Sequence, residues 1–232
     1  MTGAIHGDMT RRVVVHTAAL PWQQSPAAGV WRKRLHRVGP EESGQVTSLV
    51  RFDAGSSFAE HGHPDGEEIL VLAGTFSDED GDWGPGSYLL NPEGSRHTPS
   101  SRPGCELFVK LQQYAGTRRC RLEVDTTTRP WLPTIRAGIE EKVLYEDRAF
   151  PDRTRLERWA PGTSPGLREW PSGVELFVLD GGLADERGRY ERGAWIRLPA
   201  GDSLALSSEP GCTLYVKEGA VAWLRSEPED RE

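Results

Sequence analysis

Short apolar segments separated by turns rich in glycine and proline dominate the hydrophobic pattern of this chain. The clearest of these segments, rich in β-branched and aromatic residues, are 69–78, 87–91, 107–114, 175–185, 195–199 and 213–218. Segments 66–74 and 173–181 begin and end with glycine, which leaves too few residues for a stable helix. We therefore predict an all-β fold in which turns join antiparallel strands into sandwiches or small barrels, with little helix.

The same pattern occurs twice along the chain. Residues 52–110 align without a gap with residues 159–217, at an offset of 107 positions that places Phe52 opposite Trp159. Turn glycines and prolines coincide in the two copies, at Gly74 and Gly181, Gly86 and Gly193, Pro92 and Pro199, and Gly94 and Gly201. Further upstream the offset is 109, a difference of loop length. We expect two duplicated all-β domains, at residues 1–120 and 121–232.

Three histidines and one glutamate are spaced so that a β-barrel would bring them together. His61 and His63 are separated by one residue, so they share a face if the segment is a strand. A strand that continues through residues 64–66, or a bulge there, would return the Glu67 carboxylate to that face. The turn before His97 is rich in Asn, Pro and Gly and would aim that imidazole back across the barrel. These four residues are our candidate metal ligands.

An alternative is that the histidines are barrel residues satisfied by hydrogen bonds. Three inward imidazoles without a cation would leave too many buried polar atoms without partners, which favours a metal. Imidazole and carboxylate ligands suit Zn, Fe or Ni, and we expect one such divalent transition metal per chain. The set of three His and one Glu either closes a tetrahedral zinc site or leaves positions for water, substrate or oxygen around a metal with five or six ligands.

Composition excludes several classes of function. Charged residues make up 27% and apolar residues 36%, as in ordinary soluble proteins. The net charge of -7 opposes binding to nucleic acid, and the one basic run, 31–37, is interpreted as a solvated strand face. No apolar run approaches the roughly 18 residues of a membrane span, and the first residues lack the apolar stretch of a secretory signal. We expect a cytoplasmic protein that binds neither nucleic acid nor membrane.

The cysteines form no recognisable chemical motif. Cys105, Cys120 and Cys212 include no CxxC pair and no even-numbered framework of a secreted protein. We expect free thiols, with Cys105 and Cys212 acting as small core residues.

The two groups of motif residues resemble the two motifs of the cupin superfamily. The motif positions present are Gly55, His61, His63, Glu67 and Gly74 in the first, and Gly86, Pro92, Gly94 and His97 in the second. Only the final Asn of the second motif is missing, with Ser101 in its place. Residues 61–99, with the ALPW segment before them, look like the ChrR-like cupins. The resemblance implies two tandem jelly-roll barrels, with the metal held by the four candidate ligands.

The second copy departs from the cupin pattern at every ligand. The residues at the ligand positions are Arg168, Trp170, Val174 and Leu204. We therefore expect this barrel to bind no metal through the motif, and Arg168 to bind a carboxylate ligand or to form a surface salt bridge. Glu175 is retained opposite Glu68 although the ligands are lost, which indicates a structural role for Glu68 and the ligand role for Glu67.

The resemblance implies two different functions. Similar cupins include Fe(II) dioxygenases that split a carbon–carbon bond in a β-diketone or a hydroxyaryl ketone. ChrR-like proteins also resemble zinc-carrying anti-sigma factors. The segment before the first motif here is short and has no cysteine, so a non-enzymatic zinc sensor without the helical anti-sigma domain is the alternative. A small-molecule substrate or ligand is expected in either case, and cupins often pair as homodimers. The sequence assigns no catalytic residue.

Overall fold

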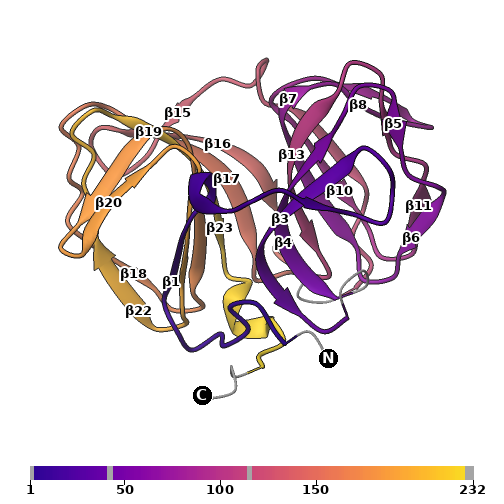
Figure 1. Cartoon of the computed structure of the whole chain (residues 1–232). Coiled ribbons are helices and arrows are strands. Elements are labelled where there is room, and N and C mark those ends of the chain that lie inside the picture. Colours follow the sequence, from indigo (N-terminus) through magenta and orange to yellow (C-terminus); the bar gives the residue numbers. More distant parts are fainter. Residues whose placement is uncertain (1–2, 41–43, 114–116, 228–232) are drawn as a thin grey trace. The chain divides into compact units, whose positions relative to one another are not determined.

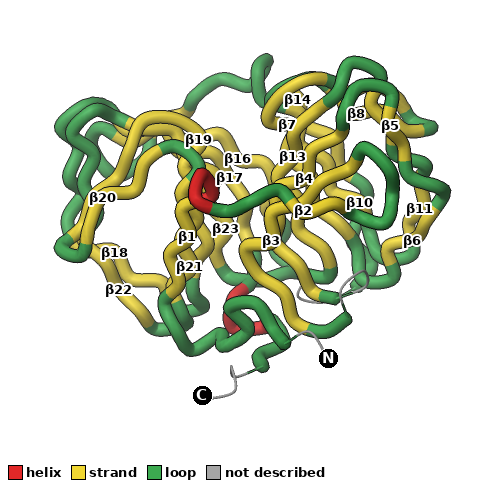
Figure 2. Tube along the Cα trace, viewed as in Figure 1, coloured by secondary structure: helices red, strands yellow, loops and turns green. Residues whose placement is uncertain are grey.

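The computed structural model describes residues 3–40, 44–113 and 117–227. Strands and turns make up nearly all of this part of the chain (Figures 1 and 2), and its helices are two short 3-10 turns, η1 (Thr17–Ala19) and η2 (Val221–Trp223). The predicted all-β class is confirmed. Tyr114, the last residue of one predicted strand, lies outside the described residues. None of the described helices has the length and apolar character needed to cross a membrane.

The chain divides into two compact units. The first unit comprises Met1–Gly7, Leu20–Thr128 and Arg225–Glu232, and the second comprises Asp8–Ala19 and Arg129–Leu224. The predicted division after residue 120 follows the repeat in the sequence. The compact units instead place residues 8–19 in the second unit and residues 121–128 in the first.

Three sheets form the described part of the first unit. The seven-stranded sheet has the order β14 (Leu122–Asp125), β10 (Ser87–Asn91), β7 (Glu67–Gly74), β13 (Cys105–Leu111), β4 (Gln45–Phe52), β3 (Val30–Val38) and β2 (Gln23–Gln24). The four-stranded sheet has the order β5 (Ser56–Ser57), β12 (Ser100–Ser101), β8 (Phe76–Asp78) and β9 (Gly81–Trp83), and β11 (Ser95–His97) pairs with β6 (His61–His63).

Alternate residues of the central strands form the core of the first unit. Val50 and Phe52 of β4, and Ile69 and Val71 of β7, are buried in one apolar cluster. The two-residue period of a pleated strand explains this arrangement, since successive side chains point to opposite faces.

The second unit repeats this architecture. Its large sheet has the order β1 (Val13–His16), β21 (Ala194–Leu198), β19 (Val174–Asp185), β23 (Cys212–Glu218), β17 (Arg153–Trp159), β16 (Ile139–Glu146) and β15 (Leu132–Pro133), with β20 (Gly188–Glu191) also paired to β19. A second pair consists of β18 (Leu167–Trp170) and β22 (Asp202–Ala205). An apolar cluster that includes Leu176, Val178 and Leu214 fills this unit.

Each unit takes one edge strand from the other copy of the repeat. Residues 13–16 and 122–125 occupy equivalent places in the two copies at the upstream offset of 109. Strand β1 nevertheless pairs with β21 of the second unit, with Val13 opposite Arg197, while β14 pairs with β10 of the first unit, with Tyr88 opposite Val124. The two copies therefore exchange equivalent strands.

Gly74 and Gly181 show why the motif glycine persists in both copies. Their φ angles are 72° and 68°, in the region that side chains other than glycine rarely adopt. A Cβ atom would lie 1.9 Å from the Gly104 carbonyl oxygen at the first position and 2.1 Å from the Gly211 carbonyl oxygen at the second. The close approach of two backbones demands glycine here, independently of any metal.

The basic run at residues 31–37 is only in part the solvated strand face that we expected, because residues 31–34 are half-buried and residues 35–37 are buried. It lies in β3, where His36 and Arg37 are buried and the Arg37 Nη2 donates to the Gly3 carbonyl oxygen at 2.7 Å. Lys33 lies over the Trp22 ring, 4.8 Å from its centroid. Local contacts therefore engage part of this positive charge, and the buried Arg37 does not contribute to a basic surface.

Candidate metal centre

The pairing of two short strands brings the three motif histidines together. In the antiparallel register of β6 and β11, His61 lies opposite His97 and His63 lies opposite Ser95. One ligand atom from each of the three histidines can be chosen so that all lie within 4.8 Å of one another. The imidazole centroids are 4.8–5.0 Å apart. The motif spacing therefore correctly predicts that these three histidines lie close together in the folded chain.

A turn, rather than a continued strand or a bulge, delivers Glu67 to the cluster. Residues 64–65 form the turn, and the Gly66 N–H donates to the His63 carbonyl oxygen at 3.2 Å. Strand β7 then begins at Glu67, whose Oε2 is 3.4 Å from His63 Nε2 and 3.6 Å from His97 Nε2. Asn91, opposite Glu67 in β10, donates to the same carboxylate oxygen at 3.1 Å.

Neighbouring acceptors fix the protons of two imidazoles. His61 Nδ1 lies 3.0 Å from the Ala59 carbonyl oxygen, and His97 Nδ1 lies 3.3 Å from Asp78 Oδ2. Because a carbonyl or carboxylate oxygen can only accept, each Nδ1 carries the hydrogen, and the Nε2 of the neutral ring keeps its lone pair. An imidazole anchored in this way through its second nitrogen is the usual arrangement of a metal ligand.

Burial acts in opposite directions on His63 and Glu67: it favours the neutral imidazole that a ligand needs, but it opposes the carboxylate form. Burial, followed by the charge of His61, lowers the pKa of His63 to about 4, so its imidazole is neutral at pH 7. Burial raises the pKa of the Glu67 carboxyl group, although nearby His97 and the Asn91 hydrogen bond oppose this effect. A cation among these atoms would favour the carboxylate form.

The distances fit a single transition metal ion. Ligand atoms bound at about 2.0–2.2 Å to one ion are about 3 to 3.5 Å apart for bond angles between the right angle and the tetrahedral angle. The separation between His63 Nε2 and His97 Nε2 is 2.9 Å, and the two distances to Glu67 Oε2 are 3.4 and 3.6 Å. These three buried donors therefore fit one metal ion, and the half-buried His61 places its ligand atom within 4.8 Å of those of the other two histidines.

A mostly apolar cavity opens beside the histidines. Its volume is 360 Å³, and its lining includes His61, His63, Glu67 and His97. Its apolar wall is formed by side chains that include Val46, Val50, Phe52, Phe58, Ile69, Phe76, Leu107, Val109 and Leu111. Arg32, Ser48, Glu60 and Gln112 add polar groups. A small molecule could thus lie against the cluster with its body in an apolar environment.

Four residues near the motif complete the surroundings of the site. Phe76 lines the cavity, whereas Tyr88 is fully buried and its hydroxyl donates to Glu68 Oε2 at 2.8 Å. Glu68 is therefore a buried hydrogen-bonding residue. Sequence reasoning missed Asp78, because the pair Asp78-Glu79 recurs in the second copy and so resembled part of the scaffold.

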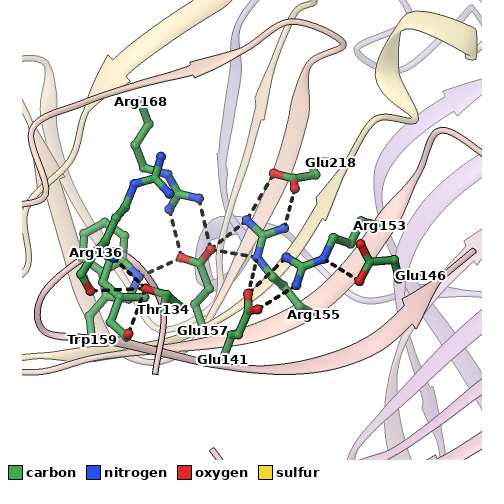
Figure 3. A network of polar contacts seen from close by, with 11 residues as sticks. Thr134, Arg136, Glu141, Glu146, Arg153, Arg155, Glu157, Trp159, Arg168 and Glu218 are labelled. Atoms are coloured by element: carbon green, nitrogen blue, oxygen red, sulfur yellow. Dashed lines mark hydrogen bonds and ion pairs between the residues drawn. The ribbon is translucent and has the colours of Figure 1, made fainter. Parts of the chain in front are cut away.

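The second unit places its substituted residues in the same arrangement. Arg168 lies opposite Leu204, as His61 lies opposite His97, while Trp170, Val174 and Leu204 join the apolar core. Figure 3 shows Arg168 directed at Glu157, to which its Nη1 and Nη2 donate at 2.9 and 3.1 Å. Arg168 is buried, so its ion pair is not the surface salt bridge that we expected as one alternative.

The buried thiols have the core role that was expected. Cys105 and Cys212 are buried free cysteines, and burial raises the pKa of Cys212 to about 11. A thiol with this pKa carries almost no thiolate at neutral pH, which disfavours nucleophilic chemistry.

Comparison with known proteins identifies the family of this chain. The family model of the ChrR cupin-like domain matches residues 10–115 and again residues 120–222. The chain belongs to the ChrR cupin-like family. This match confirms the resemblance that the two motifs indicated, and the first unit is a cupin-type metal-binding domain. The comparison with curated proteins gives no match to this chain.

Solved structures share the fold of the ChrR cupin-like chain. A candidate dioxygenase from Nostoc punctiforme has 16% identity and a TM-score of 0.76, with 95% of this chain and 88% of that chain covered. A bacterial pirin from Escherichia coli in complex with nickel(II) has 12% identity and a TM-score of 0.63, covering 90% and 98%. A variant of oxalate decarboxylase from Bacillus subtilis has 12% identity and a TM-score of 0.65, covering 93% and 78%. Together with the family match, these neighbours confirm the two tandem cupin barrels.

Proposed function

We propose that the first unit is the metal centre of a dioxygenase that splits a carbon–carbon bond in a small β-diketone or hydroxyaryl ketone. The supporting observation is the three-histidine cluster that opens onto a mostly apolar cavity of 360 Å³. The oxygen atoms of such a ketone would face the ion held by His61, His63, Glu67 and His97, while its carbon skeleton would lie against the apolar wall. The Nostoc punctiforme neighbour is named as a candidate dioxygenase, without a stated substrate.

The chain's own residues position the ligands and exclude water. When bound, Fe(II) would supply Lewis acidity that stabilises an enolate and a site for molecular oxygen. Asp78 holds the His97 ring through Nδ1, and Asn91 holds the Glu67 carboxylate, so both ligands are oriented in advance. The apolar wall, including Phe52 and Phe76, leaves few polar groups to retain water beside the reacting ketone.

The reaction balances without a further reductant. A β-diketone with a central CH2 group and one O2 would give a carboxylic acid and a 2-oxoaldehyde, with both oxygen atoms in the products. The carbon–carbon bond between one carbonyl carbon and the central carbon breaks, and each of these carbons gains one oxygen. The four electrons needed to reduce O2 come from the substrate itself.

A zinc-binding sensor is the second candidate function. The observation that favours it is the fourth donor, because Glu67 lies 3.4 and 3.6 Å from two histidine nitrogens and could close a tetrahedral site. In a closed site the cavity would bind a ligand without turnover. Tight zinc in the purified protein, with a shift in melting temperature on adding an apolar ketone, would support this function.

Oxygen uptake distinguishes the two functions. The protein is loaded anaerobically with Fe(II), mixed with a panel of β-diketones and hydroxyaryl ketones, and exposed to oxygen. We expect uptake of one O2 per substrate consumed, abolished when His61, His63 and His97 are all replaced by Ala. His16→Ala, at an exposed position of the second unit, is the matched control. No uptake from a fully loaded site would contradict the dioxygenase.

A further inference from the structure

The second unit keeps the barrel cavity but changes its chemistry. A cavity of 420 Å³ is lined by Arg153, Arg155, Glu157 and Glu218, which occupy the repeat positions of Val46, Ser48, Val50 and Leu111 in the first unit. All four of those first-unit residues line the apolar cavity beside the histidines. At these four matched wall positions, the first unit has small or apolar side chains and the second unit has charged side chains.

Buried ion pairs line the deep part of this cavity. Glu157 is buried and receives hydrogen bonds from Arg155 at 2.9 Å and from Arg168 at 2.9 and 3.1 Å (Figure 3). The Trp159 Nε1 also donates to Glu157, at 2.9 Å. Both guanidinium groups bind Glu157, but Arg155 also pairs with Glu218 at 2.9 Å and with Glu141 at 3.5 Å, whereas Glu157 is the carboxylate partner of Arg168. Arg168 uses one N–H of each Nη on Glu157, which leaves further N–H groups on the same guanidinium.

Arg136 adds a further positive charge to the lining. Its side chain lines the same cavity and is half-buried. Among the described residues, no carboxylate lies within ion-pair distance of its guanidinium group, in contrast to Arg153, which pairs with Glu141 at 2.7 Å. The cavity thus presents two guanidinium groups with remaining donor capacity, Arg136 and Arg168.

The acceptors of the cavity lie closer to solvent. Glu141 and Glu218 line it with side chains that are 21% and 33% exposed, compared with 3% for Glu157. Their carboxylates already pair with Arg153 and Arg155, and their remaining lone pairs could accept hydrogen bonds from hydroxyl or ammonium groups. An anionic group at the arginines and donor groups toward the glutamates would match this arrangement of charge.

We propose that the second unit binds a small polar carboxylate, whose carboxylate group pairs with Arg136 and Arg168 and whose hydroxyl or ammonium groups bind Glu141 or Glu218. A purely structural role explains the charged lining less well, because small or apolar side chains form the equivalent wall of the first unit. Buried ion pairs also seldom stabilise a fold more than apolar packing does. This site is separate from the metal centre and does not depend on the function proposed for it.

Titration calorimetry on the full chain tests the site. The probes are tartrate, with two hydroxyl groups, L-glutamate, with an ammonium group, and butyrate, which has no hydrogen-bond donor. We expect saturable binding of tartrate or glutamate and weaker binding of butyrate. Arg136→Ala should lower the affinity about tenfold or more, since a charge-assisted hydrogen bond is lost.

Arg158→Ala is the matched control for Arg136→Ala. Arg158 lies in β17 with Arg155 and Glu157, but its guanidinium group forms an exposed ion pair with Glu140 and is not part of the cavity lining. This variant removes one positive charge from the same unit, so we expect it to leave the affinity for tartrate and glutamate unchanged.

Three results would overturn the proposal. The first is no saturable binding of tartrate or glutamate to the wild-type chain at millimolar concentration. The second is unchanged affinity in both Arg136→Ala and Arg136→Glu, with the fold of each checked by its melting temperature. The third is loss of binding when His61, His63 and His97 are replaced by Ala, because the probe would then bind at the metal centre of the first unit.

Discussion

Asp78 has a buried carboxylate that positions the proposed ligand His97. Asp78 itself is not a proposed ligand. Its Oδ2 accepts from His97 Nδ1 at 3.3 Å, and its Oδ1 accepts from the Asp80 N–H at 2.8 Å. In Asp78→Asn we expect metal affinity to fall about 10- to 100-fold, because the His97 ring loses its charged anchor. Competition with a chelator of known affinity measures this change. The exposed Asp82→Asn is the control and should leave the affinity unchanged.

Glu67 and Glu68 are adjacent glutamates with different expected effects. Glu67→Gln should weaken metal binding, since it removes a charged donor beside His63 and His97. Glu68→Gln should leave metal binding intact and lower the free energy of unfolding by about 1–3 kcal/mol, because the buried hydrogen bond from Tyr88 is weakened. Metal titration and urea unfolding measure the two effects. Equal losses of metal affinity in both variants would contradict the assignment of Glu67 alone.

Glu157 makes the stability of the second unit sensitive to acid. Burial opposes its ionisation, but Arg155 and Arg168 outweigh burial and lower the pKa of Glu157 from 4.5 to about 2. The stability that this shift contributes is fully present above pH 4.5 and is lost as the pH falls through 2. In Glu157→Gln we expect a loss of about 3 kcal/mol or more at pH 7 and a flatter stability profile across this acid range. Unfolding measured as a function of pH checks both effects.

Spacing alone predicts which residues gather at the metal centre, but not which residues support them. His61, His63 and His97 were predicted from a two-residue period and a turn, both of which are local properties. The partnership of Asp78 with His97 depends on how β8 packs in the folded unit. The sequence predicts a carboxylate ligand or a surface salt bridge for Arg168, but its partner Glu157 lies on another strand and carries no motif.

At the scale of elements, the strand exchange predicts that a substitution in β1, which belongs to the first repeat, destabilises the second unit. A substitution in β14, which belongs to the second repeat, should destabilise the first unit. Val15 on β1 and Val124 on β14 are equivalent buried residues. We expect Val15→Ala to cost about 1–3 kcal/mol in the second unit, through lost burial against β21. Val124→Ala should have the same effect in the first unit. Hydrogen exchange measures which strands become less protected: faster exchange in β10 for Val15→Ala would contradict the observed pairing.

The sequence predicts most strands but not the exchange between them. Apolar segments such as 87–91 and 213–218 correspond closely to β10 and β23, because turn residues mark their ends. Strands β1 and β14 are both short edge strands at equivalent positions, so the pattern offers no reason for either to prefer one unit. The unit that each strand joins depends on tertiary packing, and the local pattern of apolar residues gives no information about that packing. For the same reason the turn at residues 64–65 could not be distinguished from a bulge.

At the scale of the whole molecule, we expect metal to stabilise the two units unequally. A ligand that binds only the folded state stabilises it in proportion to the logarithm of its concentration over the dissociation constant. Removing the metal with a chelator should therefore increase hydrogen exchange in β6, β7 and β11 of the first unit. Exchange in β18 and β22, the equivalents of β6 and β11 in the second unit, should remain the same. Equal changes in both units would contradict a single metal centre.

The exchanged strands also set an order for folding during synthesis. Strand β1 leaves the ribosome before the other described strands, yet its partner β21 follows only after most of the two repeats has been made. The first unit can close its large sheet once β14 has emerged, while the residues of β1 still wait for their partner. Pairing over such a long separation in sequence is slow, because the chain between the partners must first be ordered. We therefore expect the newly made protein to carry β1 without its native partner, ahead of the first barrel, until β21 has been made.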